Sequence, residues 1–380
     1  MPFVSPIPRS QPQRRQPPTR PRQPVEQRSG KQQKRQAPKL VKKLAAKRPK
    51  PNWNNDPIYQ KRRRGFAIIA GALLIILIII IGLAVHSGNT KQAEIQEPDI
   101  TQSAPPTPNP DSLTQEQLAS IGSTPILLLN IPGTWETTLD SEPNKDVGLL
   151  APALRAVVEK NHDAISFFNL PYPAEFKNVS KPQDDTYNDS RAHGVARALQ
   201  VITTYLSNNP KGSIVLTGFS QGAVIAGDVA ATIGNNKTSI SPYKILGVAL
   251  VADGRRETRY GMNQGHDTLS AQGLEVTLSQ QPALADTLLA TTGAIMTGSR
   301  QEDFGVLRGR VMQICNPRDM ICSAPNQLKP GDIANLDSIL GPNSVHAKYR
   351  TTKLSSLGNK TVPVWIRGWL TNMIRAGLAQ

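Results

Sequence analysis

A serine stands between two glycines in the pattern G-x-S-x-G, at Gly218, Ser220 and Gly222. Residues 213–217 (SIVLT) predict a short apolar strand before the pattern, and residues 221–233 predict a helix after it. A strand, a sharp turn and a helix hold a serine hydroxyl exposed in a strained backbone, and the two glycines let strand and helix pass closely. Without that context the pattern is an ordinary glycine-rich turn; with it, we predict that Ser220 is a nucleophile.

A serine hydroxyl needs a neighbouring base, and hydrolases with this turn place serine, acid and histidine in that chain order. Two histidines follow Ser220. His266 lies in a polar loop that contains glycine, whereas His346 follows a predicted strand and an acid and precedes the last predicted helix. We therefore expect His346 to be the general base, with His266 as the alternative.

The two cysteines of the chain, Cys315 and Cys322, bracket Asp319. The basic cluster at 61–64 and the apolar segment at 65–85 predict a membrane topology with the later residues outside the cytoplasm. A disulfide persists there, so we expect the two cysteines to pair. A short closed loop at the end of a strand would fix Asp319, whose expected role is to hold the His346 imidazole in the right tautomer. The alternative is that Asp319 is a turn residue and the disulfide only stabilises the fold.

An oxyanion hole requires backbone donors from the loop after the first strand and from the residue after the nucleophile. The loop at 130–136 (NIPGTWE) follows the first predicted strand, and Gln221 follows Ser220. Thr134 offers both an amide and a hydroxyl. These two residues are the candidates for an oxyanion hole.

Four motifs occur in order along the chain: G-T-x-E at 133–136, G-F-S-Q-G-A at 218–223, C-N-P-R-D-M-I-C at 315–322 and H-x-x-Y at 346–349. Together they resemble the cutinase family, over about residues 123–380. The resemblance implies the nucleophile Ser220, the acid Asp319 and the base His346, with Thr134 and Gln221 in the oxyanion hole. It is greatest to the membrane-anchored cutinase-like esterases of mycolate-containing actinobacteria, which implies phospholipase or thioesterase activity in a mycolic-acid envelope.

The chain departs from the family pattern in two ways. Typical cutinases carry a second disulfide near the first strand, and this chain has no cysteines for one. Residues 255–305 are also long for a minimal cutinase. The apolar part of that insertion, residues 283–296, is predicted to be either a mobile flap over an acyl-binding groove or an additional core helix.

Strands alternate with helices from about residue 123 onward, which predicts one α/β domain at 123–380 with a mostly parallel sheet. With the resemblance, this becomes a cutinase-like α/β-hydrolase, a three-layer sandwich. The apolar runs predict strands at 125–131, 164–169, 213–217, 244–252 and 310–315. Helical spacing of apolar residues predicts helices at 147–160, 190–207, 221–233 and 363–378.

The positive charge of the chain belongs to its amino-terminal tail. Residues 1–64 hold 19 of the 44 Lys and Arg and only two acids, whereas residues 65–380 hold 25 bases and 26 acids. The basic isoelectric point therefore does not indicate a nucleic-acid-binding protein, and we expect no nucleic-acid partner. Residues 1–64 are predicted to be a disordered, proline-rich cytoplasmic tail that meets anionic lipid headgroups, or a protein partner through its P-x-x-P spacing.

Residues 65–85 contain 21 uncharged and mostly apolar residues, long enough for one transmembrane helix. The cluster K-R-R-R at 61–64 precedes this segment, so the positive-inside rule places the amino terminus in the cytoplasm and all later residues outside. A cleaved signal peptide is the alternative, but the basic leader and the apolar run are both too long for one. Residues 86–122 are predicted to be a flexible extracytoplasmic spacer.

These features predict a single-pass enzyme of the cell membrane with its catalytic domain in the cell envelope. It would hydrolyse ester or thioester bonds of lipids through an acyl-enzyme on Ser220, without a cofactor or a metal ion. The alternatives are an acyltransferase of the same fold and a non-catalytic scaffold that displays an inactive hydrolase domain.

Overall fold

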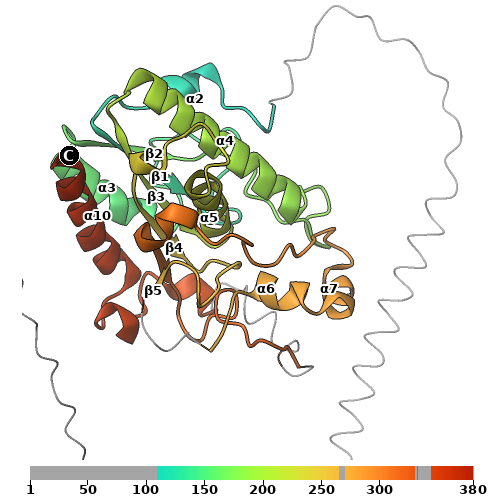
Figure 1. Cartoon of the computed structure of the whole chain (residues 1–380). Helices are drawn as coiled ribbons and strands as arrows, with labels where there is room; N and C mark the ends of the chain where they lie inside the picture. The colour runs from blue at the N-terminus through green and yellow to red at the C-terminus, as the bar shows by residue number, and fades with distance from the viewer. Residues whose placement is uncertain (1–108, 265–269, 330–331, 333–343, 380) are drawn as a thin grey trace, which may run out of the picture. The chain divides into compact units, whose positions relative to one another are not determined.

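The computed structural model describes residues 109–264, 270–329, 332 and 344–379. These residues form an α/β domain around a six-stranded, all-parallel sheet in the order β2-β1-β3-β4-β6-β5 (Figure 1). The strands are β1 Ile126–Ile131, β2 Ile165–Asn169, β3 Ser213–Phe219, β4 Ile245–Val251, β5 Met262–Asn263 and β6 Val311–Ile314. The predicted fold class, an α/β domain with a parallel sheet, is confirmed.

Helices cover both faces of this sheet. The α-helices are α2 Gln115–Ala119, α3 Ala151–Val158, α4 Tyr187–Asn208, α5 Gln221–Gly234, α6 Leu274–Ser279, α7 Pro282–Leu289 and α10 Val362–Leu378. The 3₁₀ turns are η2 Glu159–Asn161, η3 Pro242–Lys244, η4 Gly305–Arg310, η5 His346–Lys348 and η6 Ser355–Leu357. Each strand and helix predicted from the apolar pattern is present, with ends that differ by a few residues.

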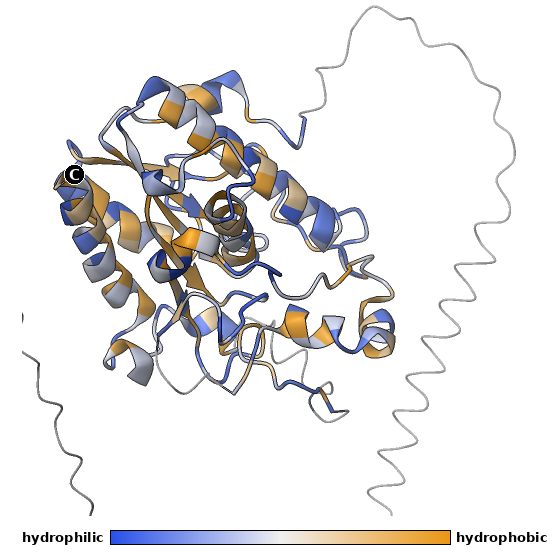
Figure 2. Ribbon diagram, viewed as in Figure 1, coloured by the Kyte–Doolittle hydropathy of each residue, from blue (hydrophilic) through white to orange (hydrophobic). Residues whose placement is uncertain are grey.

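The two faces of β1 explain why its sequence is a continuous apolar run. Leu127 and Leu129 belong to the core shared with α4 and α5, whereas Ile126 and Leu128 belong to the core shared with α3 and α10. Successive side chains of a strand point to opposite faces, so a strand buried on both sides has no polar alternation. The sheet is therefore the middle of three layers, which Figure 2 shows as hydrophobic strands between the helices.

The strand order places the ends of β1 and β3 side by side where the connections change direction. From β1 the chain crosses through α3 to β2 on one side, and then through α4 to β3 on the other side of β1. The crevice at such a switch point, at the carboxyl ends of the strands, is where parallel α/β sheets bind ligands. The loop after β1 contains Thr134 and the turn after β3 contains Ser220, so the fold brings both to this point.

The domain begins before the predicted boundary at residue 123. Residues 109–122, assigned to the spacer 86–122 from their Pro, Ser and Thr content, contain α2 with a capping box formed by Thr114 and Gln117. The buried Arg197 on α4 donates hydrogen bonds to the main-chain oxygens of Asn109, Pro110 and Ser112. The spacer prediction is therefore wrong for these fourteen residues, because a composition rich in turn formers concealed a short capped helix that packs on the domain.

The insertion at 255–305 is tied to α5 by buried ion pairs that the sequence pattern did not reveal. Arg300 pairs with Asp228 at 2.9 Å and with Asp253 at 2.7 Å, and Arg255 pairs with Asp228 at 2.7 Å. Burial alone would raise the pKa of Asp228, but the surrounding arginines outweigh it and lower that pKa. The ionised network therefore holds the insertion against the domain.

Residues 283–296, predicted to be a flap or an additional core helix, contain most of α7. This helix packs outside both faces of the main core, in a small cluster with α6 whose buried members are Leu278, Ala285 and Leu328. Met320, the neighbour of Asp319 in the chain, packs against the same cluster. The insertion therefore contacts the acid-bearing loop instead of extending the central core.

Several predicted features lie outside the described residues: the tail 1–64, the transmembrane segment 65–85, most of the spacer and His266. Among the residues that the structure describes, no helix is both long and apolar enough to cross a membrane.

Candidate active site

Ser220 occupies the sharp turn between β3 and α5 in a strained backbone conformation. Its φ of 55° and ψ of −121° lie in a region that few non-glycine residues adopt. A Cβ added at Gly218 would lie 2.2 Å from the carbonyl oxygen of Gly222, and one added at Gly222 would lie 2.1 Å from that of Ile131. Both glycines are therefore required by close backbone approach, as the sequence pattern predicted.

Three side chains from distant parts of the sequence are linked by consecutive hydrogen bonds. His346 Nε2 lies 2.9 Å from Ser220 Oγ, and His346 Nδ1 lies 2.9 Å from Asp319 Oδ2. The side chain of His346 is 11% exposed and that of Asp319 is fully buried, so only the serine end of the chain faces solvent. The structure thus brings together the three residues that the sequence selected.

The imidazole of His346 is held by its neighbours as well as by Asp319. The ring of Phe219, the residue before Ser220, stacks on it with centroids 5.0 Å apart and planes 24° apart. The Tyr349 ring packs edge-on against the imidazole at 6.4 Å. These contacts fix the plane of the imidazole ring between Ser220 and Asp319. Phe219, the residue before the nucleophile, therefore helps to orient the general base.

The carboxylate of Asp319 is held at both oxygens. Oδ2 accepts a hydrogen bond from the Tyr349 hydroxyl at 2.8 Å, and Oδ1 accepts one from the Ile321 amide at 3.0 Å. Burial, and then the charge of Asp319, raise the pKa of Tyr349 well above its usual value, so its hydroxyl keeps the proton that it donates. The predicted disulfide between Cys315 and Cys322 is present and closes the loop that carries this acid.

Two backbone amides next to the serine are available as donors. Within the described part of the chain, neither the Thr134 nor the Gln221 amide has a hydrogen-bond acceptor. The Gln221 amide is the first of α5, so the helix dipole adds to its positive potential. The side chain of Gln221 is fixed by the Tyr172 hydroxyl at 3.2 Å and the Glu175 carbonyl at 3.0 Å.

Glu136 is a functional candidate to which the sequence analysis assigned no role. Its carboxylate accepts hydrogen bonds of 2.8 Å from the amides of Gly133 and Leu149, so it fixes the loop that carries Thr134. Burial raises its pKa, against the lowering effects of the two amides, Arg350 and His346. The signal was present as the spacing G-x-x-E, in which a carboxylate can reach back to an amide three residues earlier.

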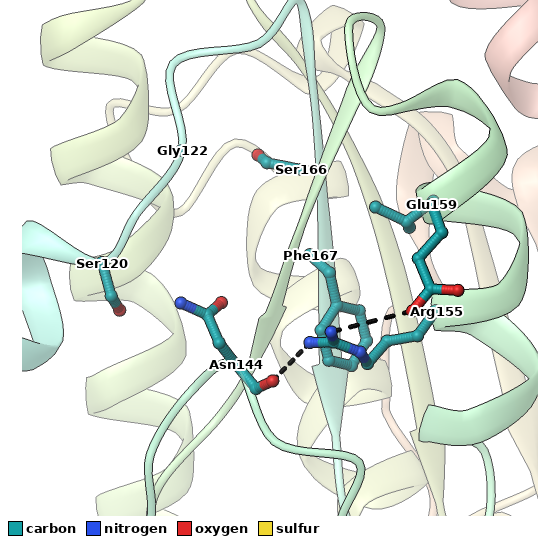
Figure 3. A pocket seen from close by; sticks show the side chains of 8 residues that line it. Ser120, Gly122, Asn144, Arg155, Glu159, Ser166 and Phe167 are labelled. Atoms are coloured by element: carbon teal, nitrogen blue, oxygen red, sulfur yellow. Dashed lines mark hydrogen bonds and ion pairs between the residues drawn. The ribbon is translucent and has the colours of Figure 1, made fainter.

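A separate pocket lies at the other end of the sheet (Figure 3). Its lining comes from the loop before β1, the loop before α3, the helix α3 and the start of β2: Ser120, Gly122, Asn144, Arg155, Val158, Glu159, Ser166 and Phe167. Ser166 pairs with Leu127 near the start of β1, so this pocket is far from the carboxyl ends where Ser220 lies. Arg155, its cation, already pairs with Asp146 at 2.7 Å. The pocket is therefore not part of the candidate active site.

Among the described residues, no group of three or more His, Cys, Asp or Glu side chains is arranged to hold a metal ion.

Comparison with known proteins places the chain in a family. Residues 139–333, which include Ser220 and Asp319, match the family model for cutinase. The carboxylesterase Culp6 homolog of Corynebacterium glutamicum is 31% identical over 324 residues, which covers 83% of this chain and all of the relative. The chain therefore belongs to the cutinase family. It is accordingly a carboxylic ester hydrolase, as predicted.

Solved structures with a similar fold are more distant. A cutinase-like protein from Cryptococcus sp. has a TM-score of 0.42 and 15% identity, over 66% of this chain and 96% of that one. The catalytic core of acetyl xylan esterase from Trichoderma reesei has a TM-score of 0.40 and 16% identity, over 65% of this chain and 99% of that one.

Proposed function

We propose that this protein is a membrane-anchored serine esterase that hydrolyses ester or thioester bonds of lipids in a mycolate-containing cell envelope. The observation that carries the proposal is the hydrogen-bond chain from Ser220 through His346 to Asp319, with 2.9 Å at each step. This arrangement activates a serine hydroxyl for attack on an acyl carbonyl.

In the first half of the reaction, His346 Nε2 takes the proton of Ser220 as Oγ attacks the carbonyl carbon. The negative charge that develops on the carbonyl oxygen is stabilised by the amides of Gln221 and Thr134. The intermediate then collapses, and His346 gives its proton to the leaving alcohol or thiol. The acyl group remains on Ser220 as an ester.

In the second half, His346 takes a proton from water, and the resulting nucleophile attacks the acyl-enzyme. Collapse of this second intermediate releases the carboxylic acid and returns the proton to Ser220. Throughout, Asp319 stays ionised and stabilises the imidazolium that forms twice in each cycle. The hydrogen bond from Tyr349 holds the carboxylate in place for this role.

The membrane anchor is supported by the apolar segment 65–85 and the basic cluster before it. An alignment that covers 83% of the 380 residues is longer than the stretch from residue 109 to the end, so it includes residues before 109. The relative thus shares part of the upstream region. It also comes from an actinobacterium, which agrees with a role in a mycolate envelope.

The proposal is tested with an active-site fluorophosphonate and a series of esters of increasing chain length, using the full chain in detergent. The wild type should be labelled and should hydrolyse lipid esters, whereas Ser220→Ala should do neither. Added sugar or lipid alcohols test the acyltransferase alternative, because an acyltransferase would form a new ester in place of free acid. An unlabelled wild type with no hydrolysis at any chain length would contradict an esterase function.

A further inference from the structure

The carboxyl-terminal part of the domain is basic, although the domain as a whole is not. Residues 344–380 contain six Lys and Arg and no Asp or Glu. Residues 65–343 contain 19 bases and 26 acids. A segment with this charge distribution carries a positive field that the rest of the domain does not share.

Five of these bases are exposed and have no partner. The side chains of Lys348, Lys353, Lys360, Arg367 and Arg375 form no ion pair or hydrogen bond within the described residues. The sixth, Arg350, differs because it donates to the carbonyl oxygens of Gly148 and Leu149. We call the five the basic C-terminal face.

The helix α10 supplies two of the five bases and places apolar side chains beside them. Val364, Arg367, Arg375 and Leu378 recur at helical spacing on its outer side, and Val364 and Leu378 are 44% and 56% exposed. The opposite side of the helix is buried against the sheet and α3. Figure 2 shows hydrophilic and hydrophobic residues side by side along α10.

Acidic residues that flank the adjacent helix do not neutralise this face. α10 packs against α3, which contains no Asp or Glu; Asp146 precedes this helix and Glu159 follows it. Glu159 and Asp146 both pair with Arg155, at 3.9 Å and 2.7 Å. The bases of α10 therefore have no competing partner on α3.

We propose that the basic C-terminal face docks the domain on an anionic lipid surface. Unpaired bases complement acidic headgroups, and exposed Val364 and Leu378 fit the boundary between headgroups and acyl chains. The mixture of apolar and basic groups favours a lipid surface over a nucleic acid, whose backbone offers no apolar layer. The inference rests on the proposed function, because it concerns how an enzyme of lipid esters meets its substrate.

One end of the basic C-terminal face lies beside the candidate active site. The turn η5 contains both His346 and Lys348, so the basic C-terminal face begins in the same turn as the proposed general base. From there it continues through Lys353 and Lys360, which the bridge between Leu354 and Lys360 places on adjacent segments. The other end of the face, with Arg375, is far from Ser220, because the neighbouring Gly377 approaches Ile126 at the start of β1. Contact through Lys348, Lys353 and Lys360 is therefore what would hold the candidate active site close to the bilayer.

Two glycines allow a direct test in the full chain. A Cβ at Gly368, beside Arg367, or at Gly309 in η4 would meet no heavy atom within 4 Å. Because both native cysteines form a disulfide, a polarity-sensitive dye would react with the new thiol of Gly368→Cys or, as the matched control, Gly309→Cys. Each labelled protein is reconstituted in phosphatidylcholine vesicles with and without phosphatidylglycerol.

The dye at 368 should shift to shorter wavelength when phosphatidylglycerol is present and should return toward its aqueous emission at high salt, because salt screens the attraction. The dye at 309 should respond to neither change. Equal emission from the two positions, or emission from 368 that does not depend on the anionic lipid, would overturn the proposal. A response of the 368 dye to duplex nucleic acid and not to vesicles would overturn the choice of partner.

Charge variants connect docking with turnover. Arg367→Gln with Arg375→Gln should abolish the lipid-dependent shift and lower hydrolysis of a vesicle-embedded ester about tenfold, while a soluble short-chain ester is hydrolysed as before. Lys211→Gln with Lys237→Gln removes the same charge outside the basic C-terminal face and should change neither. An unaltered rate on embedded esters in the first variant would contradict the proposal. If the wild type did not hydrolyse the soluble ester, the result would contradict the proposed esterase function and not the docking.

Discussion

The Tyr349 hydroxyl donates a 2.8 Å hydrogen bond to Oδ2 of Asp319, the same oxygen that faces His346 Nδ1. The hydroxyl oxygen in turn accepts a 2.9 Å hydrogen bond from the Asn316 amide. One tyrosine therefore connects the turn that carries the histidine with the loop that carries the acid. This explains the spacing H-x-x-Y: His346 begins the 3₁₀ turn η5 and Tyr349 caps it, so both side chains contact the carboxylate of Asp319.

Tyr349→Phe should lower kcat about tenfold and also lower Tm. The change removes a donor to Asp319 and leaves the buried Asn316 amide without its acceptor, at a cost of about 1–3 kcal/mol. Steady-state kinetics on a soluble ester and thermal denaturation measure the two effects. Tyr243→Phe, at a tyrosine that is 79% exposed, is the control and should change neither. Full activity in Tyr349→Phe would show that the disulfide and the Ile321 amide suffice to place the acid.

His346→Ala should lose nearly all esterase activity and keep its fold, because members of a nucleophile, base and acid set act as a unit. His266→Ala should keep most activity. Hydrolysis of a soluble ester together with circular dichroism separates loss of function from loss of structure. The reverse result, an inactive His266→Ala beside an active His346→Ala, would show that the general base is wrongly assigned.

Glu136→Gln should lower kcat about tenfold with little change in KM. The carboxylate accepts a hydrogen bond from each of two backbone amides, whereas glutamine has one oxygen and must turn its NH₂ group toward one of these donors. The loop with Thr134 would then be less well fixed for the developing oxyanion. Glu142→Gln, at a carboxylate six residues further along the chain that is 71% exposed, is the control. A larger change in KM than in kcat would indicate a role in substrate binding instead.

The same variant gives a pH dependence of stability with a defined sign. Burial raises the pKa of Glu136 in the folded protein, so the stability it contributes is present below the ordinary glutamate range and is lost as the pH rises through the raised pKa. The advantage of the wild type over Glu136→Gln should therefore shrink between acidic and neutral pH. Thermal denaturation at several pH values measures it, and an advantage that grows with pH would contradict the assigned direction.

Much of the central site could be predicted from the sequence because it is built from local patterns. Ser220 lies at a strand-to-helix turn, and Gly218 and Gly222, two residues on either side of it, are required by close backbone contacts. Chain order then selected His346 and Asp319, because a parallel sheet collects the loops after its strands at one edge. The long-range part of the prediction therefore rested on topology, which the alternation of strands and helices reveals.

The rest depends on contacts that have no local pattern. Arg300 and Asp228 are 72 positions apart and pair in the interior, and nothing in either surrounding sequence indicates the partner. Residues 109–122 have the composition of a linker, yet Arg197 binds their main chain. Composition predicts whether a segment as a whole prefers solvent. It does not predict individual hydrogen bonds between distant segments, and such bonds hold these elements in place.

Protease added to intact spheroplasts should remove the catalytic domain and spare the basic tail. This follows from the K-R-R-R cluster before the apolar segment 65–85 and from the single base, Lys91, among residues 86–99 directly after it. Antibodies against the tail and the domain, before and after permeabilisation, measure which side each lies on. Protection of the domain in intact spheroplasts would overturn the proposed orientation.

The disulfide between Cys315 and Cys322 should matter more for activity than for folding. Closing a loop this short constrains the unfolded chain by about 2–3 kcal/mol, a modest contribution for a domain of this size. Asp319, however, must stay within hydrogen-bond reach of His346, and a misplacement of about 1 Å can cost on the order of a hundredfold in rate. Because both sulfurs are buried, Cys315→Ala with Cys322→Ala removes the bridge without burying unpaired hydroxyls.

This double variant should stay folded by circular dichroism, melt at a lower temperature than the wild type, and lose esterase rate well below its melting transition. Asp319→Asn in the oxidised protein should lose rate through the wrong histidine tautomer without a comparable fall in Tm. Adding Tyr349→Phe to the double variant removes a second constraint on the carboxylate, so the combined loss should exceed either alone. If the disulfide-free protein kept its full rate up to its melting transition, Tyr349 and the Ile321 amide would be the groups that position Asp319, and the disulfide would serve stability alone.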